Sequence, residues 1–249
     1  MLLSKKVAVV YGAGGAIGGA VSRAFARAGA RVVLAGRTQD RLDKVADQIE
    51  SDGGAAETAV VDALDEEAVT AFADSVVERH ARVDISFNLI GFGDVQRPLM
   101  ELSVDDFTQP IATLMRTHFL TTRAAARHMI NQGSGVVLAF GGSGPDTIAG
   151  IGSLKVAFDA LEGQRRQWAY ELGRYGIRVV TLKTGGIPES IPDELPGMDE
   201  VVADLNRRTL LGRTATLTDV GDVACFIASD HARSITSTEI NISCGAMVD

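Results

Sequence analysis

The sequence predicts an α/β fold, in which a doubly wound parallel sheet lies between two layers of helices. Short apolar runs rich in Val, Ile and Leu alternate with longer amphipathic patterns along the whole chain. Because helices connect successive strands, the strands should run parallel. The chain has 249 residues, 46% of them apolar, which is enough to bury one large core. We therefore expect residues 1–249 to form a single domain.

The first strand, turn and helix predict a ligand site. Residues 7–11 form an apolar run, glycines follow, and small or apolar residues then repeat at helical spacing up to Ala28. Glycine leaves no Cβ between backbone and ligand, and the start of a helix offers free N–H groups. The turn fits a pyrophosphate, although close helix–strand packing also selects glycine. The expected phosphate-binding residues are Gly12, Gly14, Gly15, Ile17 and Gly18.

The other elements follow in regular alternation. The predicted strands comprise residues 7–11, 31–35, 57–61, 84–90, 135–140 and 177–182. The predicted helices comprise residues 17–28, 39–51, 65–80, 107–130 with an interruption at Pro110, 153–175, and a stretch near 198–208. Prolines interrupt the chain before that last stretch. We expect residues 188–210 to form a lid over the ligand, with a plain surface loop as the alternative.

Polar residues and glycines gather where the predicted strands end. In a doubly wound sheet, ligands bind beyond the carboxyl ends of the strands. The residues expected to complete the site are Arg37, Asp62, Ala63, Asn88, Gly91, Gly185 and Ile187.

The composition disfavours some classes of binding partner. The net charge is −8 without a long basic run, which disfavours nucleic acid and anionic membranes. No apolar stretch is long enough for a membrane span or a signal peptide, so we expect a cytoplasmic protein that binds a small molecule. Cys225 and Cys244 are far apart and form no cluster with the histidines. We expect free thiols and no metal site.

The order of these motifs resembles the short-chain dehydrogenase/reductase family over nearly the whole chain. Residues 11–18 match the family's Thr-Gly-x-x-x-Gly-x-Gly, with Tyr11 for Thr and Ala16 for the middle Gly. Asp62 matches the family's acidic residue near the adenine, and residues 88–91 stand in for Asn-Asn-Ala-Gly. Further similar segments are residues 211–213, 219–220, 226–230 and 241–246. The resemblance implies a Rossmann-like, NAD(P)(H)-binding oxidoreductase.

The end of the second strand favours NADP(H) over NAD(H). In NAD-specific enzymes an acidic side chain there bonds the ribose 2′-hydroxyl, whereas a 2′-phosphate needs a nearby guanidinium. This chain has Gly36, Arg37 and Thr38 at that point. The alternative is that Arg37 is a solvated loop residue.

The family's catalytic positions are not matched. In the family, the tyrosine of a Tyr-x-x-x-Lys pair on the long helix donates a proton to the carbonyl oxygen, and the lysine lowers the pKa of that tyrosine and holds the nicotinamide ribose. A serine after the fifth strand polarises the same oxygen, and an asparagine usually lies in the helix after the fourth strand. An alignment without gaps anchors at residues 136–137 and 169–179. It puts the following residues at the Tyr, Lys, Ser and Asn positions: Leu154, Phe158, Gly141 and Leu114.

A second register keeps Lys155 as the family lysine and puts Ile151 at the tyrosine position. It requires an insertion within the helix, so the ungapped alignment is preferred, and neither register supplies a tyrosine. Ser143, Lys155 and His118 are candidate substitutes, although a turn serine, a solvated lysine and a structural histidine are the alternatives. No residue is assigned a catalytic role.

Two functions fit this pattern. The first is an NADP(H)-dependent oxidoreductase with an atypical or impaired carbonyl site, acting on a carbonyl, an alcohol or an activated double bond. The second is a catalytically inactive nucleotide sensor or partner subunit on the same fold. The resemblance also implies a homodimer or homotetramer that pairs the helices at residues 107–130 and 153–175.

Overall fold

The chain folds around a seven-stranded sheet in the order β3-β2-β1-β4-β5-β6-β7. The structure, a computed structural model, describes residues 1–142, 147, 149–191 and 198–248. The strands are β1 Val7–Tyr11, β2 Arg31–Gly36, β3 Ala55–Val60, β4 Ile85–Asn88, β5 Gly135–Phe140, β6 Ile177–Lys183 and β7 Thr238–Asn241. All neighbouring strands pair in parallel. Strand order reverses direction between β1 and β4, which creates the switch point where such folds bind ligands.

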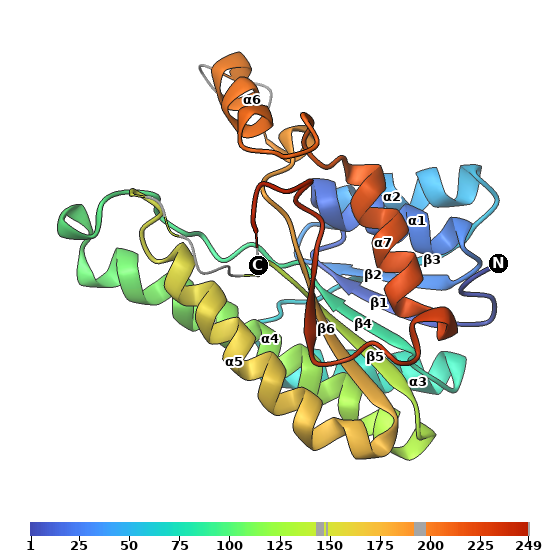
Figure 1. Cartoon of the computed structure of the whole chain (residues 1–249). Coiled ribbons are helices and arrows are strands. Elements are labelled where there is room, and N and C mark those ends of the chain that lie inside the picture. The colour runs from blue at the N-terminus through green and yellow to red at the C-terminus, as the bar shows by residue number, and fades with distance from the viewer. Residues whose placement is uncertain (143–146, 148, 192–197, 249) are drawn as a thin grey trace.

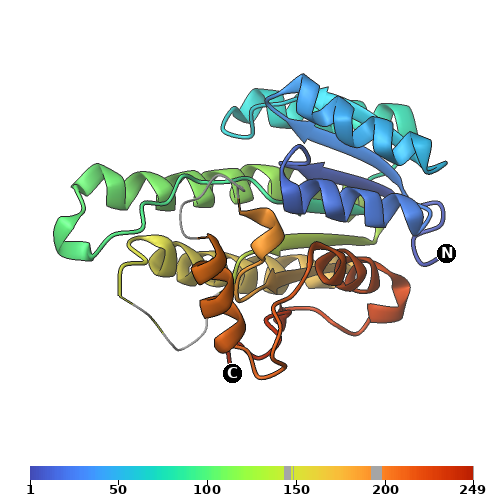
Figure 2. The same ribbon diagram turned by 90° about the horizontal axis from the view of Figure 1, so that it is seen from above.

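Two layers of helices cover the sheet. The helices are α1 Ala16–Arg27, α2 Gln39–Ser51, α3 Glu66–His80, α4 Val104–Gln132, α5 Leu154–Leu172, α6 Met198–Arg207 and α7 Leu217–Ala228. Helices α1, α2 and α7 pack on one face, and α3, α4 and α5 pack on the other (Figure 1). Helices α4 and α5 run side by side (Figures 1 and 2). The predicted α/β fold, with its doubly wound parallel sheet, is confirmed.

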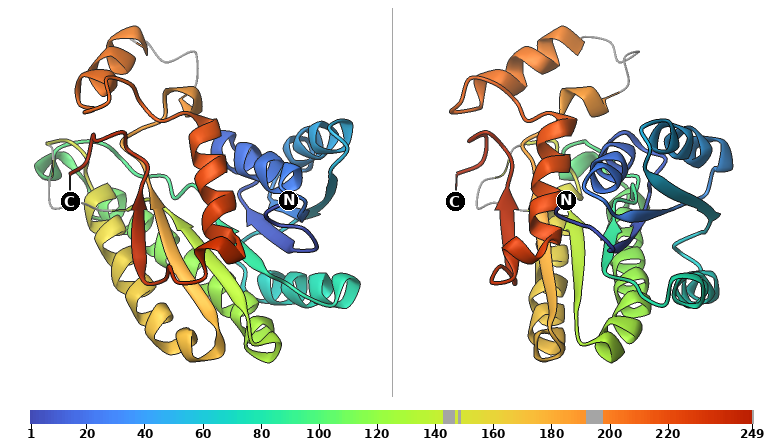
Figure 3. Two further views of the ribbon diagram at one scale, coloured as in Figure 1. Left: turned by 45° about the vertical axis from the view of Figure 1, so that its right-hand side comes forward. Right: turned by 90° about the vertical axis from the view of Figure 1, so that its right-hand side faces the viewer.

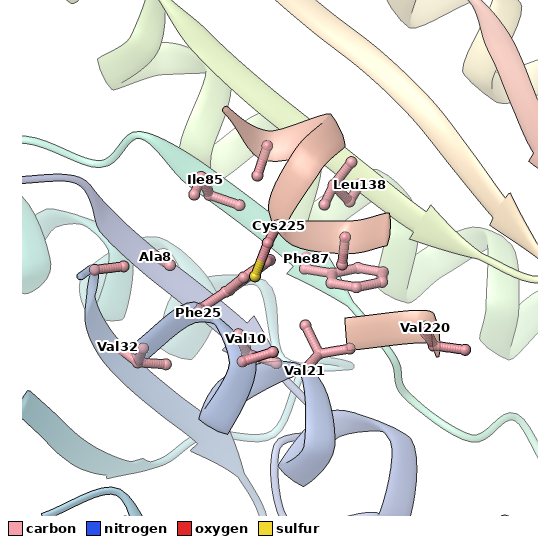
Figure 4. Packing of buried hydrophobic residues seen from close by; sticks show 14 of the residues in the cluster. Ala8, Val10, Val21, Phe25, Val32, Ile85, Phe87, Leu138, Val220 and Cys225 are labelled. Carbon is pink, nitrogen blue, oxygen red and sulfur yellow. The ribbon is translucent and has the colours of Figure 1, made fainter. Parts of the chain in front are cut away.

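The core on the α1 side is built from aliphatic residues around two phenylalanines. Phe25 of α1 and Phe87 of β4 are fully buried, with ring centroids 6.5 Å apart (Figure 4). Cys225 of α7 points into the same cluster (Figure 4). Its thiol is free, and burial raises its pKa to about 12. Cys225 therefore packs as a small apolar side chain.

The predicted interruption at Pro110 is wrong, because α4 runs continuously from Val104 to Gln132 with Pro110 inside it. Proline removes one helical N–H bond, whereas α4 contacts both α3 and α5. Tertiary contacts of this kind stabilise a helix and offset the loss of one bond. Ser103 begins it by accepting a hydrogen bond from the N–H of Asp106, and Gly133 ends it in a left-handed conformation.

Helix α6 stands apart from the two layers, beyond the carboxyl end of β6 (Figures 1 and 3). Its Leu205 lies against Gly186, where an added Cβ would come within 2.9 Å of the leucine side chain. The short helix Pro188–Ser190 lies between β6 and α6 in the chain. No helix in the described part of the chain has the length and hydropathy to span a membrane.

Candidate functional site

Two adjoining cavities lie beyond the carboxyl ends of the strands. The β1–β3 cavity measures about 290 Å³ and is lined by the residues that follow β1, β2 and β3. The β4–β5 cavity measures about 480 Å³ and is lined from β4, β5, α4 and α5. Both are lined by Gly12, Gly15, Leu89, Ile90 and Gly91. The two cavities therefore meet at the turn after β1 and form one cleft across the switch point.

The glycines of that turn serve different purposes. Gly12 has a φ of +78°, and a Cβ there would lie 2.5 Å from the carbonyl oxygen of Leu89. A Cβ on Gly18 would lie 2.3 Å from the carbonyl oxygen of Gly12. Close packing therefore requires glycine at both positions. At Gly15, by contrast, the nearest atom to an added Cβ is 3.4 Å away, so a side chain there would extend into the cleft.

Helix α1 presents its amino terminus to this turn. Gly15 precedes the helix with an extended backbone and forms no side-chain cap. Gly19 is the first residue whose N–H reaches back to the turn, bonding the carbonyl of Gly15 at 2.8 Å. The N–H groups of Ala16, Ile17 and Gly18 have no helical carbonyl to bond. A short cradle of backbone donors thus faces the junction of the two cavities, which suits a diphosphate.

The β1–β3 cavity carries two guanidinium groups and one carboxylate. Arg37 and Arg41 both line it, as does Asp62, which accepts a 3.0 Å hydrogen bond from the N–H of Leu64. A Cβ on Gly14 would lie 2.8 Å from the Cβ of Arg41, so this glycine lets α2 approach the turn. Sequence analysis missed Arg41. Its position in the first turn of α2, four residues after Arg37, is the signal that identifies it.

Asn88 is placed at the cleft, but its polar atoms are already paired. It is 3% exposed; its Nδ2 donates to Thr121 Oγ1 at 3.0 Å, and its Oδ1 accepts from the N–H of Ile90 at 3.0 Å. Asn88 therefore joins the end of β4 to α4 and shapes the loop that carries Gly91. Ala63 lines the β1–β3 cavity, and Ile17 lines the β4–β5 cavity.

Gly185 and Ile187 lie beside the cleft and are absent from the described lining of both cavities. A Cβ on Gly185 would lie 2.5 Å from the Cβ of Ala246, and Ile187 is 3% exposed. Ser190, three residues after Ile187, does line the β4–β5 cavity. Contact of Gly185 and Ile187 with a nicotinamide stays a prediction.

Apolar side chains occupy the wall of the β4–β5 cavity where α5 begins. Leu154 and Phe158 both line it, and Phe158 meets Phe92 edge-to-face with ring centroids 5.8 Å apart. Gly141 has a φ of +99°, and a Cβ there would lie 2.3 Å from Cε1 of Phe158. The ring of Phe158 thus occupies the space that a side chain at position 141 would need. Leu114, also in the lining, is 1% exposed.

Lys155 is placed away from this wall. Its Nζ lies 2.8 Å from the carboxylate of Asp159, one helical turn along α5. Neither Lys155 nor Ile151 belongs to the described lining of the β4–β5 cavity, whereas Leu154 and Phe158 do. The choice between the two alignments stays a prediction. Ser143, the other candidate, lies outside the described residues.

His118 of α4 lines the β4–β5 cavity and is only 4% exposed. Burial lowers the pKa of its imidazole to about 3, because a charged ring would lose its hydration. His118 is therefore neutral at physiological pH and can act as both hydrogen-bond donor and acceptor.

Four charged groups lie behind Gly142, at the other side of this wall; three are buried and Glu239 is half-buried. Lys183 and Glu239 are 3.4 Å apart, and Glu162 bonds Arg165 at 2.6 Å. A Cβ on Gly142 would lie 2.6 Å from the Glu239 carboxylate. Burial, followed by the neighbouring Glu162, raises the pKa of the Glu239 carboxyl group. The cluster ties α5, β6 and β7 together beneath the loop after β5.

Comparison with known proteins decides the family. A family model described as enoyl-(acyl carrier protein) reductase matches residues 12–247. The uncharacterized oxidoreductase YxbG of Bacillus subtilis is 31% identical, over 98% of this chain and 92% of its own length. The chain belongs to the short-chain dehydrogenase/reductase family.

Solved structures of short-chain dehydrogenases and reductases share the whole fold. One from Serratia marcescens BCRC 10948 is 26% identical, with a TM-score of 0.89 and complete coverage of both chains (100% each). A 7α-hydroxysteroid dehydrogenase complexed with NADH and 7-oxo glycochenodeoxycholic acid is 26% identical, has a TM-score of 0.88, and aligns over 99% of this chain and 96% of its own. This member of the family is thus an oxidoreductase-type protein with a nucleotide-binding, Rossmann-like fold.

Proposed function

We propose that this protein is an NADP(H)-dependent oxidoreductase with an atypical carbonyl site. The dinucleotide would lie along the cleft, with its diphosphate at the amino terminus of α1 and its adenosine in the β1–β3 cavity. The observation that carries the proposal is the junction at Gly15, where free helical N–H groups face an open space that a Cβ would fill. The nicotinamide, when bound, supplies or accepts the hydride.

Preference for NADP(H) is supported by Arg37 and Arg41. Both guanidinium groups line the β1–β3 cavity at the end of β2, where a ribose 2′-phosphate would lie. Asp62 lines the same cavity and already accepts the N–H of Leu64, which leaves its other oxygen for the adenosine side. The two arginines would neutralise the dianionic 2′-phosphate of NADP(H). The uncharged 2′-hydroxyl of NAD(H) would gain no such stabilisation.

Fluorescence titration tests this cofactor assignment. Wild-type protein should bind NADPH about tenfold or more tightly than NADH, because only NADPH offers the phosphate to the arginines. Arg37→Glu should reverse the order by repelling the 2′-phosphate. Arg233→Ala, an exposed arginine outside the cleft, is the matched control and should leave both affinities unchanged. Equal affinities in the wild type would reject the NADP preference, and binding of neither would reject the dinucleotide site.

The residues around the reacting end would orient and shield the ligands rather than protonate them. Leu154 and Phe158 give the β4–β5 cavity an apolar wall, and Asn88 fixes the loop between the two cavities. Positioning of the reactants can itself support hydride transfer, while the loss of a general acid costs about 10²–10⁴-fold in rate. We therefore expect slow reduction of activated carbonyls or conjugated double bonds.

An inactive nucleotide sensor or partner subunit is the second candidate. It is favoured by one specific observation at Gly141, which the ungapped alignment puts at the family's serine position. Gly141 has no hydroxyl, and the ring of Phe158 fills the space that a serine side chain would need. Oxidation of NADPH with ketones, quinones and enones separates the candidates. If tenfold more protein adds no rate, the sensor is favoured. Leu154→Tyr combined with Phe158→Lys should then create activity if the ungapped alignment is correct.

We further propose that residues 188–210, of which 192–197 lie outside the described residues, act as a lid.

We also propose that two chains pair through α4 and α5. The outer face of these helices exposes Tyr170 at 86% and Phe119 at 40%. Phe119 stacks on Trp168 with centroids 5.6 Å apart, under the guanidinium of Arg123. Light scattering should give a dimer or tetramer mass, and Phe119→Asp should lower it.

A further inference from the structure

The β4–β5 cavity combines an aromatic and aliphatic wall with one buried imidazole. Its apolar lining comes from the start of α1, the loop after β4, α4, the end of β5 and the start of α5. These apolar side chains are Ile17, Leu89, Ile90, Phe92, Leu114, Phe140, Leu154 and Phe158. A volume of about 480 Å³ falls within the usual range for small-molecule sites.

The imidazole of His118 has no partner among the described residues. No described side chain or backbone group bonds either ring nitrogen, although the residue is 4% exposed. The side-chain hydrogen bond at His118 involves its backbone carbonyl, which accepts from Thr121 Oγ1 and leaves the ring unused. A buried polar group without a partner costs free energy unless a ligand or water satisfies it. His118 lines the cavity, so the missing partner would come from the cavity side.

The other polar side chains in the described lining are paired. Asn88 bonds Thr121 and the N–H of Ile90. Gln96 donates to Asp94 at 3.0 Å, and the hydroxyl of Ser190 donates to the carbonyl of Ile187 at 2.8 Å. His118 therefore differs from its polar neighbours, since its ring forms no hydrogen bond with any described residue.

We propose that the β4–β5 cavity binds an uncharged, largely apolar carbonyl compound, whose oxygen accepts a hydrogen bond from the imidazole of His118. The inference rests on the proposed function, because it assigns the substrate class of that same site. It makes His118 a substrate-binding residue, carried on α4 rather than on the family's tyrosine helix.

Charge explains why the compound should be neutral. The described lining holds no lysine or arginine, and its one carboxylate, that of Asp94, is half-buried and accepts a hydrogen bond from Gln96. An anionic group would therefore lose hydration without gaining a cation. Burial keeps the pKa of His118 near 3, so the ring bonds as a neutral donor. A neutral imidazole can polarise a carbonyl oxygen without becoming charged itself.

A matched pair of ligands isolates the hydrogen bond. α-Tetralone and tetralin share a bicyclic frame and differ by the carbonyl oxygen, and both are titrated calorimetrically with and without NADPH. Wild-type protein should bind α-tetralone about tenfold more tightly, the gain expected from one well-placed hydrogen bond. His118→Leu should reduce that preference to about twofold or less. His118→Gln, which keeps an N–H donor, should retain part of it, and exposed His231→Leu is the control.

The outcomes separate the inference from the proposed function. A tenfold carbonyl preference that survives in His118→Leu overturns the inference, as does its absence from the wild type. If His118→Leu fails to fold, ¹⁵N resonances of labelled histidine in the wild type decide: α-tetralone but not tetralin should shift the resonance of His118, and no shift overturns the inference. Failure of NADPH to bind removes the proposed function, but the carbonyl preference without NADPH still tests His118.

Discussion

The two halves of the cleft are built on different principles. The β1–β3 cavity depends on backbone geometry and charge: glycines, free N–H groups at α1, Arg37 and Arg41. The β4–β5 cavity depends on apolar side chains around the imidazole of His118. The first half needs bare backbone, where a side chain would intrude, whereas the second half is shaped by side chains that can be exchanged without changing the fold.

The largest expected effect is at the junction of the halves. Gly15→Val should abolish NADPH binding, with affinity at least about 100-fold weaker, because the side chain would enter the space for the diphosphate. The melting temperature should change little, since the residue has a negative φ of −85° and room for a Cβ. Gly12→Ala, at a positive φ, should instead lower stability. Unchanged NADPH affinity in Gly15→Val would place the dinucleotide elsewhere.

The next largest expected effect concerns protein stability at the wall of the β4–β5 cavity. Gly141→Ser should destabilise the protein by about 2–3 kcal/mol, because it combines a positive φ with overlap on Phe158. Adding Phe158→Ala should recover part of that loss in a denaturant double-mutant cycle. Gly163→Ser, at an exposed site with no atom within 4 Å, is the control. Strict additivity of Gly141→Ser and Phe158→Ala would show that the ring is not responsible.

A third effect follows from the buried imidazole. Because the pKa of His118 is about 3 when folded and about 6.5 when unfolded, the unfolded chain binds a proton that the folded chain does not. Stability should therefore fall as the pH drops below about 6.5, by about 2 kcal/mol at pH 5. Urea denaturation of His118→Gln should show a flatter pH dependence than the wild type or exposed His231→Gln. Parallel curves for wild type and His118→Gln would contradict the buried neutral state.

The smallest expected effect concerns NADPH affinity in the β1–β3 cavity. Arg41→Ala should weaken NADPH binding by about three- to tenfold and leave NADH binding unchanged, because the guanidinium meets only the 2′-phosphate. The loss should shrink at high salt, where phosphate–arginine attraction is screened. Titrations at two salt concentrations measure it. An equal loss for NADH would mean that Arg41 contacts the shared diphosphate instead.

Much of the fold could be predicted because its signals are local. Strand residues are apolar in runs, and the glycines after β1 follow from a turn that leaves no room for a Cβ. The polar strand β7 was missed, since Thr238–Asn241 is short and only half-buried. The interruption predicted at Pro110 was wrong, because contacts between α4 and its neighbouring helices offset the one backbone hydrogen bond that proline removes.

The site was harder to predict where residues meet only in three dimensions. Arg37 lies directly after a strand, so its place at the cleft follows from the topology. The overlap of Phe158 with Gly141, and the burial of His118, depend on how α4 and α5 pack against β5. Periodicity places His118 on a face of a helix but does not show what that face meets.

The charged cluster behind Gly142 links strand β7 to the wall of the cleft. Glu239 lies on the last strand, yet it faces Lys183 of β6 and neighbours Glu162 of α5. A nonsense mutation or a protease cut before Thr238 would remove that carboxylate and expose the edge of β6. Loss of the segment from Thr238 onward would therefore remove support for the wall of the cleft from behind.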